Sequence, residues 1–263
     1  MNTLTIRISR DHIIFCTYDR LQNTLPVYEV CDNDPDISLN ANIHKAIKAS
    51  MLAQSNYNFV DAYFTGTSTL VPLKEFEEEY INDIYFFNFP SLKETDKVFY
   101  DTLPYLNALL LFSIDKGVCH SLKEFYPQVK FHCTLTPLIL QFVARYPFSA
   151  TEPRLYCYFN EDKLTTIVIS NGQLDFMNTY THHRINDALY YIASVAQRTG
   201  LTSTAEGIYI SGDHDTAQNI TRSLDKIGFH GFHMADSEEL SHHPVSEISE
   251  FPYDMKVMLL KAY

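Results

Sequence analysis

Hydrophobic and polar residues alternate at the start of the chain. Apolar or β-branched side chains recur through 4–8 and again through 12–18, with the polar turn Ser9-Arg10-Asp11 between them. A period of two, interrupted by a short polar turn, predicts two antiparallel strands. The elements expected next are a strand over 26–31, a helix with Ile43, Ile47 and Met51 at four-residue spacing, and a strand over 59–65 that ends at Gly66.

The same order of elements returns roughly 150 residues further along the chain. Three strands are expected, over 155–159, 164–170 and 173–180. Asn171-Gly172 joins the last two, and this pair is a strong hairpin signal because a type I′ turn needs two positive φ angles. The remaining elements are a helix with an apolar stripe that ends at Gly200, a strand over 207–211 that ends at Gly212, and a helix that is capped by Asp213 or Asp215 and ends at Gly228.

Both parts read strand-strand-strand-helix-strand, which predicts a duplicated α/β architecture. We expect one half over 1–148 and the other over 149–263, with a hinge at 146–153 that contains two prolines and no periodicity. The other expected elements are an acidic helix over 72–80, strands over 84–89, 98–103 and 108–114, helices over 120–125 and 137–145, a polar loop over 236–252 and a final helix over 254–262.

The duplicated unit resembles the actin-like, ribonuclease-H-like (ASKHA) superfamily, which includes sugar kinases, actin and the Hsp70 ATPase domain. The segment 155–212, with its Asn171-Gly172 hairpin, its long helix and Ile208-Tyr209-Ile210-Ser211-Gly212, resembles pilus-assembly and secretion-platform actin-like proteins. As a whole, the chain resembles an uncharacterised bacterial family of this type with no assigned activity. The resemblance implies two βββαβ-type halves with mixed sheets.

The resemblance also implies an ATP site, which this sequence does not preserve. In active members of the superfamily, two glycine-rich hairpins contact the phosphates, because backbone N–H groups must approach without a Cβ in the way. The corresponding turns here, Ser9-Arg10-Asp11 and Asn160-Glu161-Asp162, contain no glycine, and the adenosine loop keeps only Gly212. We therefore expect degenerate nucleotide loops and no cofactor. The residues expected at the cleft are Arg10, Asp11, Asn160, Glu161, Lys163, Gly212 and Asp213.

Composition narrows the possible chemistry further. The formal net charge of −12 argues against a nucleic-acid partner. The eight glycines form no G-x-G-x-x-G, P-loop or G-x-S-x-G motif, which excludes Rossmann and P-loop functions and argues against a serine hydrolase. The residues 66–70 are instead expected to form a loop whose hydroxyl groups cap a following helix. Five scattered cysteines, the lack of a signal segment and the lack of a long apolar run indicate a cytoplasmic protein with no membrane span.

Histidines near the end of the chain leave one alternative open. His230, His233, His242 and His243 are candidate metal ligands beside several aspartates. The H-x-x-H spacing across a turn and strand points its side chains to opposite faces, however, so surface histidines are the favoured interpretation. A metal-dependent hydrolase that uses these histidines remains an alternative hypothesis.

Aromatic residues bear on the choice of function. Eighteen Phe and eighteen Tyr are present, and tyrosine is frequent at protein interfaces. In the strand expected over 84–89, Tyr85, Phe87 and Phe89 share a face; a strand buried on both faces is favoured over an interface edge. The leading hypothesis is a non-catalytic actin-like protein that binds another protein or itself. The alternative is a nucleotide-binding switch or ATPase in which Arg10 or Lys163 reaches the phosphates.

Overall fold

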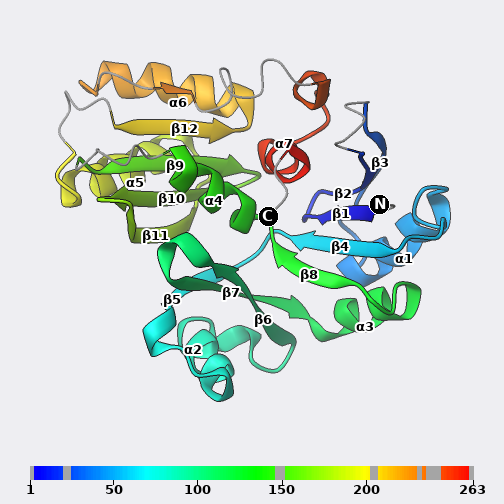
Figure 1. The fold of residues 1–263 in the computed structure, drawn as a ribbon. Coiled ribbons are helices and arrows are strands. Elements are labelled where there is room, and N and C mark those ends of the chain that lie inside the picture. The colour runs from blue at the N-terminus through cyan, green and yellow to red at the C-terminus, as the bar shows by residue number, and fades with distance from the viewer. Residues whose placement is uncertain are drawn as a thin grey trace. The chain divides into compact units, whose positions relative to one another are not determined.

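The protein contains two compact units, each built around a five-stranded sheet (Figure 1). The computed structural model describes residues 3–19, 25–145, 152–201, 207–229, 233–234 and 244–260. The first unit comprises Met1–Thr136 and Leu259–Tyr263, and the second comprises Pro137–Met258. The helix α4 (Leu135–Arg145) contains the boundary between them.

The sheet of the first unit has the strand order β3-β2-β1-β4-β8. Strands β1, β4 and β8 are parallel, and β2 is antiparallel to both β1 and β3. Leu4, Ile6 and Ile8 of β1 are buried, as the alternating sequence predicts. The strands are β1 (Thr3–Ile8), β2 (His12–Thr17), β3 (Val27–Asp32), β4 (Phe59–Phe64) and β8 (Lys130–Cys133).

The sheet of the second unit repeats this arrangement strand for strand. Its order is β11-β10-β9-β12-β13, with β9, β12 and β13 parallel and β10 antiparallel to β9 and β11. The strands are β9 (Arg154–Asn160), β10 (Lys163–Ser170), β11 (Gln173–Thr181), β12 (Ile208–Gly212) and β13 (His233–Met234). Because order and directions match in both sheets, the predicted duplication of the βββαβ unit is confirmed.

The second unit has helices on both faces of its sheet. Leu155, Cys157 and Phe159 of β9 belong to a core that also contains the apolar stripes of α5 (Ile185–Arg198) and α6 (His214–Lys226). The alternate residue Tyr156 stacks at 4.5 Å on Phe142 of α4, and Tyr158 lies 6.5 Å from Tyr253 of α7 (Tyr253–Leu260). Successive side chains of β9 therefore pack alternately against the helices on one face of the sheet and those on the other.

Turn residues in this unit adopt the backbone angles that the sequence predicts. Asn171 and Gly172 have φ angles of 50° and 71°, which is the type I′ pattern of a two-residue hairpin. Gly200, with a φ of 76°, directly follows the capping residue Thr199 at the end of α5. A left-handed residue at this position is a common helix terminator.

The first unit contains an additional module between β4 and α3 (Lys116–Phe125). Three antiparallel strands in the order β5-β7-β6 form its sheet, and the helix α2 (Ile81–Asn88) contributes Tyr85 to a separate core with Val71, Val98, Leu109 and Leu111. We call this module the insertion. Its strands are β5 (Ser68–Pro72), β6 (Asp96–Leu103) and β7 (Ala108–Asp115), with four short 3₁₀ turns at Leu73–Glu75, Glu78–Tyr80, Pro90–Leu92 and Pro104–Leu106. The first unit also contains α1 (Leu39–Ala49), which packs on α3.

The prediction of a strand over 84–89 is wrong, because residues 84–88 lie in α2 and Phe89 is its C-cap. Ile81, Ile84, Tyr85 and Phe89 all face the core of the insertion, and their spacing is that of a helix. A run of consecutive aromatic residues contains a period of two and a period of 3.6 at once. The tertiary contacts select the helical pattern.

The prediction of an acidic helix over 72–80 is also wrong. Two 3₁₀ turns occur there, separated by the extended residues Phe76 and Glu77. Four glutamates within five positions repel one another on a helix, and Phe76 contacts the core of the insertion. Both effects favour an interrupted backbone.

Smaller differences concern α1 and the segment 66–70. Met51 lies beyond the end of α1 and is 83% exposed, so it does not continue the apolar stripe. Ser68 begins β5, and Thr67 Oγ1 lies 2.7 Å from Tyr85 Oη, so these hydroxyls do not cap a helix. β8 is a strand that the sequence pattern did not predict.

Some predictions fall on parts of the chain that are not described. The proposed hinge at 146–153 lies outside the described residues over 146–151, and the polar loop over 236–252 does so over 236–243. The rest of that loop contains the 3₁₀ turn Pro244–Glu247. In the described residues, no helix has both the length and the apolar character needed to cross a membrane.

Candidate functional site

The turn between β1 and β2 holds the candidates Arg10 and Asp11. Hydrogen bonds within the chain fix this turn: Ser9 N–H donates to the His12 carbonyl at 3.1 Å, and His12 N–H donates to Ser9 Oγ at 3.2 Å. The side chain of Asn33 donates to the carbonyls of Ser9 and Arg10, each at 3.0 Å. Arg10 Nε lies 3.0 Å from Asp11 Oδ1, so the guanidinium has a carboxylate partner in the turn itself.

The turn between β9 and β10 occupies the same place in the second sheet. Asn160 pairs with Lys163 across it, and Glu161 adopts a left-handed backbone with a φ of 52°. The ammonium of Lys163 donates to Thr181 Oγ1 at 2.6 Å and lies 3.9 Å from Asp162 Oδ1. The cation that an altered phosphate site would need is therefore bonded within its own sheet.

Gly212 ends β12 beside the end of β9, and Asp213 follows it. A Cβ on Gly212 would lie 1.9 Å from the carbonyl oxygen of Phe159, and the φ angle of Gly212 is 110°. Asp213 N–H donates to that same carbonyl at 3.2 Å, and Asp213 Oδ1 caps α6 by accepting from Thr216 N–H at 2.8 Å. Close packing of β12 on β9 accounts for this glycine without any ligand.

Five of the seven candidate cleft residues thus lie at neighbouring strand ends in the second unit. Gly212 pairs with Phe159, which directly precedes Asn160 and Glu161. In the described residues 159–163 and 212–213, this edge carries the carboxylates of Glu161, Asp162 and Asp213 and the ammonium of Lys163. A polyphosphate approaching it would meet net negative charge, which weakens its binding. Arg10 and Asp11 belong to the first unit.

The candidate metal ligands fall on parts of the chain whose side chains are not described. His230, His242 and His243 lie outside the described residues, and for His233 only the backbone is described, as part of β13. Among the residues that are described, no group of three or more His, Cys, Asp or Glu side chains is arranged to hold a metal ion.

Three of the five cysteines, Cys16, Cys119 and Cys157, do not provide an activated nucleophile. All five are described, and none forms a disulfide. Burial raises the pKa of the Cys16 thiol to about 12 and that of Cys119 to about 11, and it also raises the pKa of Cys157. These thiols stay protonated at neutral pH and therefore behave as small apolar groups.

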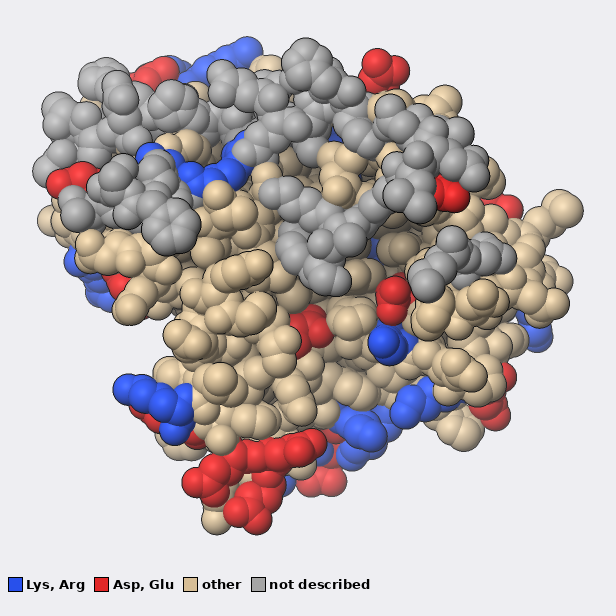
Figure 2. Space-filling model, in the orientation of Figure 1, with Lys and Arg blue, Asp and Glu red and all other residues tan. Residues whose placement is uncertain are grey.

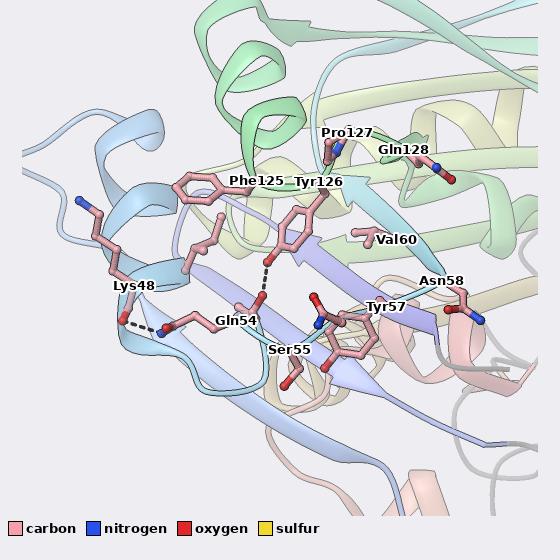
Figure 3. Close-up of a pocket in the computed structure, with 13 residues that line it drawn as sticks. Lys48, Gln54, Ser55, Tyr57, Asn58, Val60, Phe125, Tyr126, Pro127 and Gln128 are labelled. Atoms are coloured by element: carbon pink, nitrogen blue, oxygen red, sulfur yellow. Dashed lines mark hydrogen bonds between the residues drawn. The ribbon is translucent and has the colours of Figure 1, made fainter.

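A cavity of about 890 Å³ lies in the first unit, between the end of α1, the segment leading into β4 and the turn after α3 (Figure 3). The side chains of Ile47, Val60, Phe125 and Tyr126 contribute apolar surface to it, and polar residues, among them Lys48, Gln54, Ser55 and Asn56, make up much of the rest of its lining. Exposed amides of Asn58 and Gln128 stand at one end. It lies where β4 begins, whereas ligands of open α/β sheets bind at the carboxyl ends of the strands.

Tyrosine hydroxyls beside this cavity are bonded to the backbone. Tyr126 Oη donates to the Ala53 carbonyl at 2.7 Å, as Figure 3 shows, and Tyr57 Oη donates to the Leu52 carbonyl at 2.8 Å. Burial raises the pKa of both phenols. The two tyrosines therefore hold the loop after α1 in place and offer ring surface, rather than an acid or a base, to a bound molecule.

A partly buried ionic cluster connects the insertion to the main sheet of the first unit. His132 of β8 lies 2.8 Å from Asp101 of β6 and 3.6 Å from Asp61 of β4. Asp101 Oδ2 also accepts from Cys133 N–H at 2.8 Å and from Thr136 Oγ1 at 2.6 Å. Burial by itself would lower the His132 pKa, but the hydrogen bond to Asp101 and the charges of both carboxylates raise it to about 9.

Because His132 is protonated at neutral pH, it acts as a fixed cation and not as a base. The arrangement joins three strands and has the character of a structural ion pair. Neither this cluster nor the role of Asn33 was predicted from the sequence. Asp61, Asp101 and His132 are far apart in the chain, and no motif marks them. In the sequence, the role of Asn33 in the turn is indicated only by its position as a polar residue directly after β3.

Comparisons with solved structures identify the class of protein. A protein from Bacteroides thetaiotaomicron VPI-5482, with an actin-like ATPase fold and unknown function, matches with a TM-score of 0.84 at 24% identity over 99% of this chain and 96% of that chain. A chain of the PilM-PilN type IV pilus biogenesis complex matches with a TM-score of 0.52 at 10% identity, over 88% of this chain and 87% of that one. The protein thus has the actin-like ATPase fold that the repeated sheets define.

The family follows from the sequence comparison. Residues 1–227 match the family described as "protein of unknown function (DUF3822)", and the chain belongs to this family. The search of curated proteins gave no match.

Proposed function

We propose that this protein is a non-catalytic actin-like protein that works as a protein-interaction or scaffold module. The observation that carries this proposal is the internal hydrogen bonding of the turns at the phosphate positions. In the β1–β2 turn, the N–H groups of Ser9 and His12 are bonded within the turn, and Asn33 holds two of its carbonyls. A phosphate cradle needs successive N–H groups that point outward to the ligand.

The second turn supports the same conclusion by a different route. Glu161 and Asp162 bring negative charge to the position where a phosphate would bind, and Lys163 is bonded to Thr181. Gly212 is needed by the contact with Phe159 and so is no evidence for an adenosine loop. Both turns therefore meet a polyphosphate with hydrogen bonds that are made within the chain and, at the second turn, with added negative charge.

Two further observations favour a protein partner over a small molecule. Large aromatic side chains are exposed on several helices and turns, including Phe87, Tyr105 and Tyr190. Tyrosine and phenylalanine at a surface are typical of the buried centre of protein interfaces. PilM, the match with a TM-score of 0.52, is described in a complex with PilN. An actin-like fold can thus bind another protein.

Calorimetric titration tests the absence of a nucleotide site. The full chain is titrated with ATP and with ADP, each with Mg²⁺, and we expect no saturable heat at millimolar nucleotide. A matched variant, Glu161→Gln with Asp162→Asn, removes the repulsive charges and is expected to gain at most weak binding, because the β1–β2 turn stays closed. Saturable binding by the wild-type chain, reduced by Arg10→Glu, would establish the nucleotide switch in place of the proposal.

Elemental analysis of the same preparation tests the metal-dependent hydrolase. The expected result is no stoichiometric transition metal and no thermal shift on adding Zn²⁺. A bound metal that is lost in a His242→Ala, His243→Ala double variant would support the hydrolase and contradict the proposal.

A further inference from the structure

The insertion is an addition to the duplicated fold rather than a part of it. In the second unit, β12 passes through Gly212 and Asp213 directly into α6. In the first unit, the chain leaves β4 and returns to α3 only after β5, α2, β6 and β7. Since the second sheet has the same strand order without such a module, the actin-like architecture does not depend on the insertion.

The inner face of α2 is fully used by the insertion's own core. Tyr85 is completely buried, and its hydroxyl lies within hydrogen-bond distance of Thr67 Oγ1, the Thr67 carbonyl and Ser113 Oγ, at 2.7, 2.9 and 3.1 Å. Phe86 and Phe89 pack around the ring of Tyr85, with centroids at 5.6 and 4.8 Å. The helix is therefore anchored without any contribution from its outer side chains.

The outer face of α2 exposes two aromatic rings. Tyr80, the N-cap residue of α2, and Asp83 and Phe87 within the helix lie at positions i, i+3 and i+7, which places them on the same side of the helix. Tyr80 is 50% exposed and Phe87 is 88% exposed. Contact with another molecule at this stripe would remove the apolar surface of both rings from water.

Carboxylates surround this stripe. Glu77, Glu78 and Glu79 immediately precede Tyr80 and are all exposed. Within the described part of the chain, no salt bridge reaches these three glutamates or Asp83, and the ammonium of Lys74 is paired with Glu75 at 3.5 Å. Figure 2 shows acidic side chains gathered at the edge of the molecule where Figure 1 draws α2.

We propose that this acidic-aromatic face, formed by Tyr80, Asp83 and Phe87 with Glu77–79, docks a cationic segment of another protein in which Arg or Lys alternates with apolar residues. The inference rests on the proposed function and names the partner chemistry for it. Arginine pairs with carboxylates and stacks on aromatic rings, so one residue type satisfies both features. The charge of the face opposes contact with anionic lipid or nucleic acid.

A second copy of this chain is a poorer occupant of this surface. A two-fold symmetric contact would bring the face onto itself and place four carboxylates opposite four others. The net charge of −12 adds a long-range repulsion between copies. A basic partner is attracted both by the carboxylates of the face and by the negative net charge of the chain. Salt would screen this attraction and weaken the association.

The test uses the full chain and a labelled twelve-residue peptide of alternating Arg and Leu, with an alternating Glu-Leu peptide for comparison. Fluorescence anisotropy is measured for the wild type, Phe87→Ala, the pair Glu78→Gln with Glu79→Gln, and the control Tyr190→Ala, which removes an exposed aromatic from α5. We expect Phe87→Ala to weaken binding of the Arg-Leu peptide about tenfold or more. The double glutamine variant should weaken binding and reduce its salt dependence, while Tyr190→Ala matches the wild type.

Three results would overturn the inference. They are equal affinity of Phe87→Ala and the wild type, equal binding of the Glu-Leu peptide, and a concentration-dependent dimer in light scattering that Phe87→Ala abolishes. The last result would identify a second copy as the occupant. Unchanged thermal unfolding of Phe87→Ala verifies that the variant is folded. Nucleotide titration is a separate readout, so failure of this face with no ATP binding leaves the proposed function standing.

Discussion

The two halves of the protein contain sheets of the same strand order, but they differ in how the chain leaves the fourth strand of the repeated unit. In the second half, the N–H of Asp213 donates to the Phe159 carbonyl and the chain turns at once into α6. In the first half, the N–H of Thr65 makes the equivalent bond to the Ile8 carbonyl at 3.1 Å, and the chain then enters the insertion. The common backbone bond maintains the sheet, while the exit determines what each half offers to other molecules.

A glycine is structurally required after the fourth strand in only one of the two halves. Gly212 must be glycine because its backbone is left-handed and presses against Phe159. A Cβ added to Gly66, two residues after the end of β4, would have no atom within 4 Å. Two glycines that look alike in the sequence are thus expected to respond very differently to substitution.

The largest effect is expected for Gly212→Ala. Its Cβ would overlap the Phe159 carbonyl, so β12 must shift away from β9, and we expect a loss of roughly 3 kcal/mol or more in the free energy of unfolding. The matched change Gly66→Ala should stay within about 0.5 kcal/mol of the wild type. Urea denaturation monitored by circular dichroism measures both. Similar values for the two variants would contradict the role given to the Phe159 contact.

The next largest effect concerns the His132 cluster, which has no described counterpart in the second half. The folded pKa of about 9 lies above the ordinary value of 6.5, so protonation stabilises the folded state. This contribution is fully present below pH 6.5 and is lost as the pH rises through about 9. The difference between these two pKa values corresponds to a stabilisation on the order of 3 kcal/mol.

Denaturation of the wild type and of His132→Gln from pH 6 to pH 10 measures this contribution. We expect the stability gap between the two proteins to narrow as the pH rises, since the wild type loses its ion pairs. His120→Gln is the control, because His120 is an exposed residue of α3. A gap for His132→Gln that is constant with pH would show that the imidazole is not charged in the fold.

A smaller effect is expected for Asn33→Ala, which tests the closed β1–β2 turn. The substitution removes two hydrogen bonds to the carbonyls of Ser9 and Arg10, and we expect a loss of about 1–2 kcal/mol. Asn82→Ala, on the exposed face of α2, is the control and should be near neutral. Nucleotide binding gained by Asn33→Ala would mean that the turn is closed by this side chain alone.

The smallest expected effects compare the two faces of α2. Tyr85→Phe removes a buried hydroxyl that has three partners, and we expect a loss of about 1 kcal/mol. Phe87→Ala should change the stability by less than about 0.5 kcal/mol, because the ring is almost fully exposed. Thermal unfolding measures both, and a large loss for Phe87→Ala would show that the outer face is structural.

Much of the duplicated core was predictable because local sequence and tertiary structure agree there. The alternation in β1 and β9, the Asn171-Gly172 hairpin and the apolar stripe of α5 each encode one element. The insertion was less predictable. Its aromatic run satisfies two periods at once, and its glutamates favour a helix by propensity although their charges oppose one.

Candidate site residues divide in the same way. The lack of glycine in the turns at Ser9-Arg10-Asp11 and Asn160-Glu161-Asp162 is visible in the sequence and predicted altered phosphate loops. The bonds that close those turns were not visible, because Asn33 and Thr181 reach them from neighbouring strands or their ends. The cluster of Asp61, Asp101 and His132 likewise exists only where three strands meet.

By itself, the sequence determined the repeated order of strands and helices, because periodicity and turn residues act over a few neighbouring positions. It also determined which turns lack glycine. Only the tertiary structure decided that residues 84–88 form a helix, that Gly212 is required by Phe159, and that His132 is held as a cation. Each of these depends on contacts between residues distant in the chain, where burial and charge outweigh local preference.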